Sequence, residues 1–100
     1  MANGGESRSI VRATLATGEA VSVHESTQIA GTTPNSPHTI QHSEFILMRE
    51  GTLAFEHDGI SEQAGPGSII YVAYGTLHTV RNVGTVAATY TVIAIGGDQK

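Results

Sequence analysis

Residues 53–64 read LAFEHDGISEQA, a run in which Asp58 and Gly59 separate two five-residue segments. A two-residue hairpin turn of type I′ needs positive φ at both central positions, and Asp-Gly adopts that geometry readily. The run therefore predicts a β-hairpin with strands at Leu53–His57 and Ile60–Ala64.

Similar segments recur along the rest of the chain. They are short, rich in Val, Ile, Thr and aromatic residues, and separated by turns marked with glycine or proline, whereas no stretch has the period of a helix. This pattern predicts an all-β domain, and because open sheet edges invite aggregation, the strands should close into a small barrel or jelly roll. The further predicted strands are Ser9–Leu15, Ala20–Gln28, His38–His42, Glu44–Glu50, Ser68–Val72, Leu77–Asn82 and Val86–Ile95.

The composition narrows the class of protein. The chain has 100 residues, no cysteine and a net charge of −4, which indicates one domain, excludes disulfides and thiolate metal sites, and offers no basic patch for nucleic acid. No apolar run is long enough to cross a bilayer, so no membrane partner is expected. We expect a flexible leader at residues 1–8, a barrel at 9–96 and a flexible tail at 97–100. A cytoplasmic location is expected, and an export signal removed ahead of residue 1 stays open.

Three histidines and one glutamate have spacings that could bring them around one metal ion. His38, His42 and Glu44 share one parity of an extended segment, so their side chains could point the same way, and His78 opens a later apolar strand that could face them. Imidazole nitrogens with one carboxylate suit Mn, Fe, Ni, Cu or Zn better than Ca or Mg. In a metal-free alternative, Glu44 pairs with a protonated His38 or His78, because an unpaired buried carboxylate is costly.

The spacing of these residues resembles the two motifs of the cupin family, G-x5-H-x-H-x3/4-E-x6-G and G-x5-P-x-G-x2-H-x3-N. The resemblance covers roughly residues 20–95, with Ala73 where the second motif has proline and Ile40 where the first has its second histidine. The matching positions are His38, Glu44, Gly51, Gly67, Gly75, His78 and Asn82.

The resemblance implies a single-domain double-stranded β-helix, a jelly-roll barrel. It also implies a divalent transition metal held by His38, Glu44 and His78, three of the family's four ligands. His42 lies one pleat beyond Ile40 and could supply the missing nitrogen. Alternatively, the chain turns between Gln41 and Ser43 and aims His42 elsewhere.

Other residues are expected to form the surroundings of the site. Ile40, Ile46 and Met48 share the parity of Glu44, and core filling is an equally weighted alternative to a role in a substrate pocket. The tyrosines could donate a proton, but a structural hydrogen bond is the more common role of a buried tyrosine. The predicted pocket wall is Ile40, Ile46, Met48, Phe55, Tyr71 and Tyr90.

Several residues are given structural or solvent-facing roles instead. The motif glycines and Gly84 are expected to supply turn conformations. Asn82 is expected to bond to its own turn. His24 and His57 are expected to be solvated.

Two strands, around Phe45–Met48 and Ser68–Val72, are apolar on both faces and need cover on both. A second subunit is the simplest cover, so a homodimer is expected.

The resemblance implies a metal-dependent enzyme, such as a dioxygenase or isomerase, acting on a small organic molecule. The alternatives are a non-catalytic small-molecule or metal-binding module and a structural dimer with a degenerate site, because a fold does not fix a function.

Overall fold

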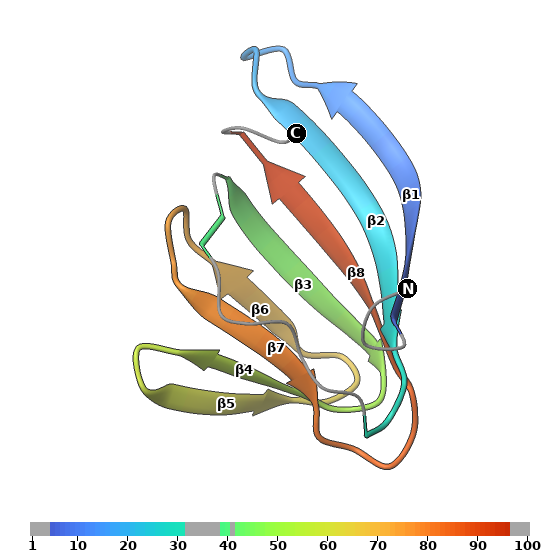
Figure 1. Cartoon of the computed structure of the whole chain (residues 1–100). Helices are drawn as coiled ribbons and strands as arrows, with labels where there is room; N and C mark the ends of the chain where they lie inside the picture. The colour runs from blue at the N-terminus through green and yellow to red at the C-terminus, as the bar shows by residue number, and fades with distance from the viewer. Residues whose placement is uncertain (1–4, 32–38, 41, 97–100) are drawn as a thin grey trace.

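The computed structural model describes residues 5–31, 39–40 and 42–96, and within them the chain forms eight strands and no helix (Figure 1). No helix that could span a membrane is therefore found among these residues. The strands form two antiparallel sheets, of order β1-β2-β8-β3-β6 and β5-β4-β7. The strands are β1 (Gly5–Thr14), β2 (Ala20–Gln28), β3 (Ser43–Glu50), β4 (Leu53–His57), β5 (Ile60–Ala64), β6 (Ile69–Val72), β7 (His78–Asn82) and β8 (Ala88–Ile95).

The hairpin predicted at residues 53–64 is confirmed. Strands β4 and β5 have the predicted bounds, and Leu53 pairs with Ala64 at the open end of the hairpin. Asp58 and Gly59 have φ values of 50° and 74°. Both central residues of the turn therefore have the positive φ that the type I′ geometry demands.

Two expectations about strand boundaries are corrected. β1 begins at Gly5, opposite Gln28, so residues 5–8 belong to the sheet and not to a leader. Thr39, Ile40 and His42 are not in a strand, while His38 and Gln41 lie outside the described residues. The amide of Gly75 donates to the carbonyl of Ile40 (3.0 Å), so this segment is bonded to the turn before β7 and not to a neighbouring strand.

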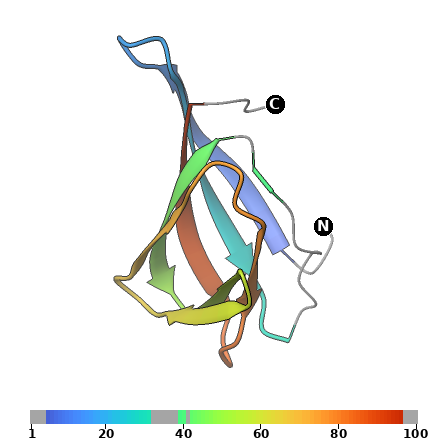
Figure 2. The same ribbon diagram turned by 90° about the vertical axis from the view of Figure 1, so that its left-hand side faces the viewer.

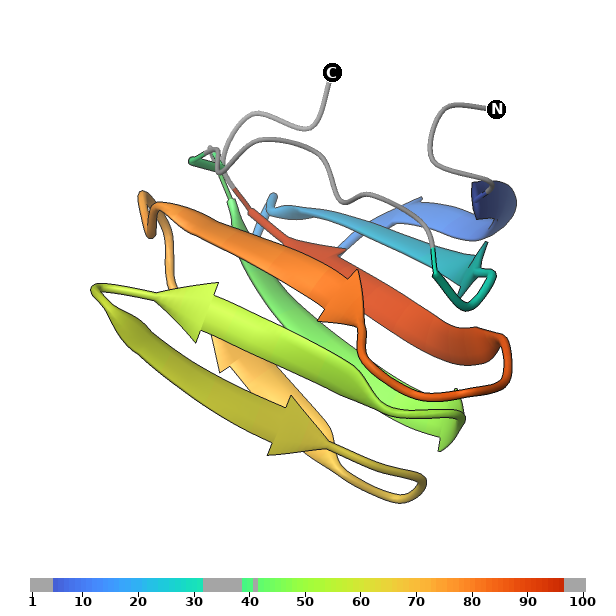
Figure 3. The same cartoon turned by 60° about the horizontal axis from the view of Figure 1, so that its bottom comes forward.

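The two sheets face each other and enclose one apolar core (Figure 3). β8 alternates buried and half-buried residues along its whole length, as expected for a strand with one face against a core. Leu53 and Val72 are fully buried. The core comprises Ile40, Ile46, Met48, Leu53, Phe55, Ala64, Val72, Ala88, Tyr90 and Val92.

Gln28, the last residue of β2, joins the two sheets at one end of the barrel. Its side-chain oxygen accepts a hydrogen bond from the Asn82 amide (3.1 Å), and the Asn82 side chain donates to the Gln28 carbonyl (2.9 Å). The Asn82 side chain also accepts from Gly84 N and donates to Val86 O, both at 2.9 Å, which confirms the predicted bonding to its own turn. These bonds fix the end of the barrel formed by the start of β8 and the end of β7.

Candidate metal centre

Glu44 lies on the interior face of the five-stranded sheet. It is the second residue of β3, and its lateral neighbours are Ala94 of β8 and Val72 of β6, which are both buried. Residues opposite each other in a ladder point to the same face, so the carboxylate points between the sheets. Its side chain is only 14% exposed. The carboxylate is thus held in a largely dry environment.

His42 lies directly against this carboxylate. Its Nε2 donates to Glu44 Oε2 at 2.7 Å, and the side chain of His42 is 17% exposed. Its other ring nitrogen, Nδ1, is buried and has no hydrogen-bond partner among the described residues. The structure therefore brings His42 to Glu44, although the segment around His42 is a bend and not the predicted strand.

His78 lies at the same end of the barrel, in the opposite sheet. The register pairs His78 with His57 and Asn82 with Leu53, so His78 is at the end of β7 away from the Gln28–Asn82 contacts. Glu44 is likewise at the end of β3 remote from Gln28, since Glu44 pairs with Ala94 and Gln28 with Ala88. His78 is 4% exposed, and its Nδ1 donates to the Thr76 carbonyl at 2.9 Å. That bond fixes the ring orientation and leaves Nε2 as the basic nitrogen of the neutral imidazole.

Among the four predicted ligands, the described structure brings only His42 and Glu44 into contact. No three His, Asp or Glu side chains of the described residues lie close enough together to hold a metal ion. His38 lies outside those residues. Imidazole nitrogen and carboxylate oxygen are ligand types that transition metals prefer. The buried Nδ1 of His42 is a possible ligand atom that has no hydrogen-bond partner among the described residues.

His57 was expected to be solvated, and this expectation is corrected. Its side chain is 24% exposed and shares the inward face of β4 with Leu53 and Phe55. The His57 ring lies 4.8 Å from that of Phe55, and its Nδ1 lies 3.4 Å from Asp58. Its parity with the apolar residues of β4 was the signal in the sequence that could have identified it.

Five of the six predicted pocket residues, Ile40, Ile46, Met48, Phe55 and Tyr90, are buried in the apolar core. Tyr71 is the exception and corrects the prediction. Val72 pairs with Glu44, so these two side chains share the interior face of the sheet. Tyr71 is the neighbour of Val72 in β6 and points the other way, so its ring lies on the outer face, 5.1 Å from that of Phe45. Tyr71 and Phe55 also border a hollow of about 360 Å³ between β5 and β6.

Tyr90 is buried and its hydroxyl lies 3.4 Å from Gln28 Nε2. Burial raises the pKa of Tyr90 above its ordinary value of 10.0; the Gln28 hydrogen bond lowers the pKa, and the charge of Glu44 raises it further. The folded state therefore holds the Tyr90 proton more tightly than the unfolded state does. The resulting contribution to the free energy of unfolding is fully present below pH 10 and is lost as the pH rises above that value.

We therefore expect Tyr90→Phe to change the free energy of unfolding by only about 1 kcal/mol at pH 7, where one long hydrogen bond is lost. Between pH 10 and 11.5, the wild type should lose stability faster than the variant. Urea unfolding of both proteins across this range measures the difference. Parallel pH profiles would contradict the assigned effect of Tyr90 burial.

Comparison with known proteins agrees with the architecture. A family model described as a cupin domain matches residues 24–94. An RmlC-like cupin family protein of Methanocaldococcus jannaschii superposes with a TM-score of 0.78 at 13% identity, over 96% of this chain and 84% of that one. A cupin superfamily protein of Desulfitobacterium hafniense gives 0.76 at 14% identity, over 95% and 80%.

A polyketide cyclase of Streptomyces resistomycificus also has a TM-score of 0.76, at 17% identity, over 99% of this chain and 74% of that one. At such identities the likeness concerns the fold alone. No curated protein matches this chain.

Proposed function

Because this chain belongs to the cupin family, we propose that it binds a divalent transition metal at the end of its barrel where His42, Glu44 and His78 lie. The proposed ligands are these three residues together with His38. A small organic molecule would bind beside the metal, against the apolar residues of the interior.

The observation that carries the proposal is the environment of Glu44. Its carboxylate is 14% exposed and is bonded to His42, whose Nδ1 is buried without a partner in the described part of the chain. A buried polar atom without a hydrogen bond costs about 1–3 kcal/mol, and a buried charge needs a counter-charge. A cation bound at the Glu44 carboxylate would supply that counter-charge.

The donor set favours Mn, Fe, Ni, Cu or Zn. His78 would bind through Nε2, because its Nδ1 donates to the Thr76 carbonyl, and such a bond is the usual support of a metal-ligating imidazole. A metal held this way would supply Lewis acidity toward a carbonyl oxygen. The residues of the chain would orient the substrate and exclude water around it.

Catalysis of a dioxygenase or isomerase type is the enzymatic form of the proposal. The same fold is found in a polyketide cyclase, so the architecture is compatible with an enzyme. A binding module without turnover is the second candidate, and the replacement of a motif histidine by Ile40 favours it. Oxygen uptake and isomer formation across a panel of small carbonyl compounds, measured on metal-loaded protein, separate the two.

Metal titration by calorimetry, with elemental content measured after purification without chelator, tests the site itself. We expect Glu44→Gln and His78→Ala each to raise the Kd for Zn²⁺ or Ni²⁺ at least tenfold. Both should also abolish the rise in melting temperature on adding metal, since a ligand stabilises the state that binds it.

Glu56→Gln is a matched control, because Glu56 pairs with Arg81 (3.1 Å) away from the site. This control should bind metal like the wild type. Wild-type protein that neither contains nor binds metal would refute the proposal, and so would unchanged affinity in both site variants.

A further inference from the structure

The register gives the β1–β2 hairpin an inner side, which continues the interior face of the five-stranded sheet. Ser22 and His24 of β2 lie opposite Ala94 and Val92 of β8, which are both buried. Residues opposite each other in a ladder point to the same face, so Ser22 and His24 point to the inner side. Figure 2 shows the turn between β1 and β2 standing clear of the three-stranded sheet, so that sheet leaves this part of the inner side uncovered.

The inner side of the hairpin is polar, apart from Ala20 beside the turn. Ser9 pairs with His24 and Arg12 pairs with Ser22, so the side chains of both strands share this side. The β1 residues are exposed from Ser7 onward, whereas Ser22 and His24 are half-buried. The polar residues of the inner side are Ser7, Ser9, Arg12 and Thr14 of β1 and Ser22, His24, Ser26 and Gln28 of β2.

A β-bulge determines which side Arg12 faces. The register shifts by one residue between Ser9 and Val11, so Ile10 is an extra residue in β1. With regular alternation after Ser9, Val11 would point inward and Arg12 outward, and the extra residue reverses this. Bulges are frequent next to functional sites, where they re-aim a side chain. In this hairpin the bulge directs a cationic side chain, and not an apolar one, to the inner side.

Arg12 and His24 border a hollow of about 350 Å³ on the inner side. A volume of this size accommodates a small organic molecule. The guanidinium group presents five N–H donors in a planar fork that matches two oxygens of a carboxylate or phosphate, while imidazole and hydroxyl groups add single hydrogen bonds. The hollow therefore has the donors that an oxyanion needs. Its other lining residues are Ser7, Ser9, Ser22 and Val23.

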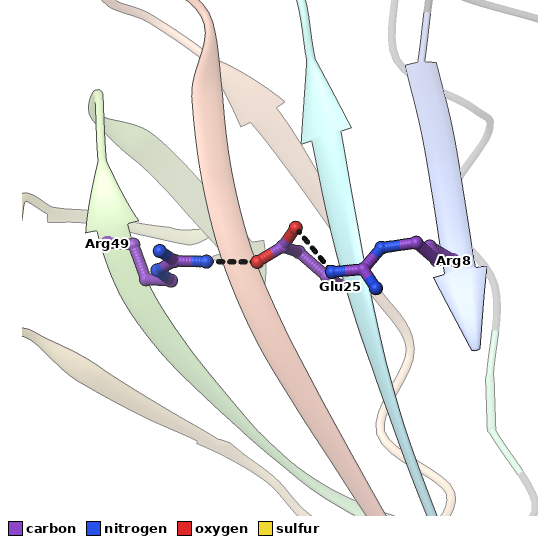
Figure 4. A network of polar contacts seen from close by, with 3 residues as sticks. All are labelled: Arg8, Glu25 and Arg49. Atoms are coloured by element: carbon purple, nitrogen blue, oxygen red, sulfur yellow. Dashed lines mark hydrogen bonds and ion pairs between the residues drawn. The ribbon is translucent and has the colours of Figure 1, made fainter. Parts of the chain in front are cut away.

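The carboxylate of the hairpin is engaged on the opposite side. Within residues 7–14 and 20–28, Glu25 is the one acidic residue. It is the neighbour of His24 in β2 and points outward, where it forms ion pairs with Arg8 and Arg49, at 3.4 Å in the case of Arg8 (Figure 4). Over these two ranges no carboxylate points to the inner side, so the charge of that side is complementary to an anion.

We propose that the inner side of the β1–β2 hairpin binds a small oxyanion, the carboxylate or phosphate group of an organic molecule, through the guanidinium of Arg12. His24 and the serine hydroxyls would complete its hydrogen bonds. The row Arg12–Ser22–Ala94–Glu44 crosses the sheet, so Arg12 lies three strands from Glu44. Three strand spacings are about 14 Å, and the anion site is therefore separate from the proposed metal centre and does not rest on it.

Amide chemical shifts of the full-length, metal-free protein test the proposal, with inorganic phosphate and succinate titrated separately at constant ionic strength. A site this open to solvent should bind with a Kd of about 1 mM and shift the amides of Ser9, Arg12, Ser22 and His24. Arg12→Ala should raise this Kd about tenfold, because a charge-assisted hydrogen bond is lost. Arg12→Lys keeps the charge without the fork and should give an intermediate Kd. Arg12 is exposed, so both variants should fold, and circular dichroism checks this.

Arg8→Ala is the matched control, because Arg8 belongs to the same strand and carries the same charge but lies on the outer side with Glu25. It should bind both probes like the wild type. Equal weakening by Arg8→Ala and Arg12→Ala would show a response to net charge alone and overturn the proposal. It would also be overturned if the hairpin amides do not shift, or if uncharged glycerol binds as tightly. Binding of either anion supports the proposal, and the tighter probe identifies the group that the site prefers.

Discussion

Replacing Ile40 with histidine should lower the melting temperature of the metal-free protein and tighten transition-metal binding at least tenfold. Ile40 is 7% exposed and packs in the core, so an imidazole there costs about 1–3 kcal/mol without a partner. It also occupies the motif position of the family's second histidine. Even outer-shell partners of metal ligands change affinity by about 10–100-fold, so a new direct ligand should do at least as much.

Ile46→His is the control for this experiment. Ile46 is buried in the same core and lies on the face of Glu44, but it is not a ligand position of the motif. It should destabilise the metal-free protein similarly and leave the affinity unchanged. Calorimetric titration with thermal unfolding of both forms measures the two effects. If Ile40→His fails to bind metal more tightly, the site is not short of a ligand at that position.

Gly51→Ala should destabilise the protein by about 3 kcal/mol. Gly51 has φ of 77°, a conformation that costs L-residues about 1–2 kcal/mol. A Cβ built there would lie 2.7 Å from both the Ala87 carbonyl oxygen and the Ala88 Cα. These are backbone atoms at the start of β8, so the contact can be relieved only by moving a strand.

Gly67→Ala separates the two contributions. Gly67 has a similar φ of 86°, but a Cβ there would meet nothing within 4 Å. This variant should therefore lose only the conformational part, about 1–2 kcal/mol. Denaturant unfolding of both variants gives the difference. Equal losses in the two variants would show that the close approach of Gly51 to β8 does not limit stability.

The strands were largely predictable because their signals are local. Turn chemistry at Asp58-Gly59 fixed one hairpin, and β2 also has the predicted bounds. The expected strand over His38–His42 was wrong in its described part, because Ile40 bonds to Gly75, 35 residues further along the chain. No local pattern signals a bond over that separation.

In the candidate site, too, local patterns were informative, whereas contacts between residues distant in the sequence were not predictable. Parity along an extended segment predicted His42 on the side of Glu44; the two side chains do form a hydrogen bond, but His42 lies in a bend, so alternation along a strand is not its cause. Parity alone did not say which face of a strand is the interior. Tyr71 was therefore expected inside and lies outside, whereas His57 was expected in solvent and lies on the inward face of β4.

The amino-acid sequence by itself determined the β class, the hairpin and the candidate donor residues of this protein, since turn geometry and side-chain alternation act over a few residues. Only the tertiary structure decided which faces became interior and which end of the barrel received Glu44 and His78. Those features depend on the register between strands distant in sequence, such as β3 with β8, and that register is set by packing of the whole chain.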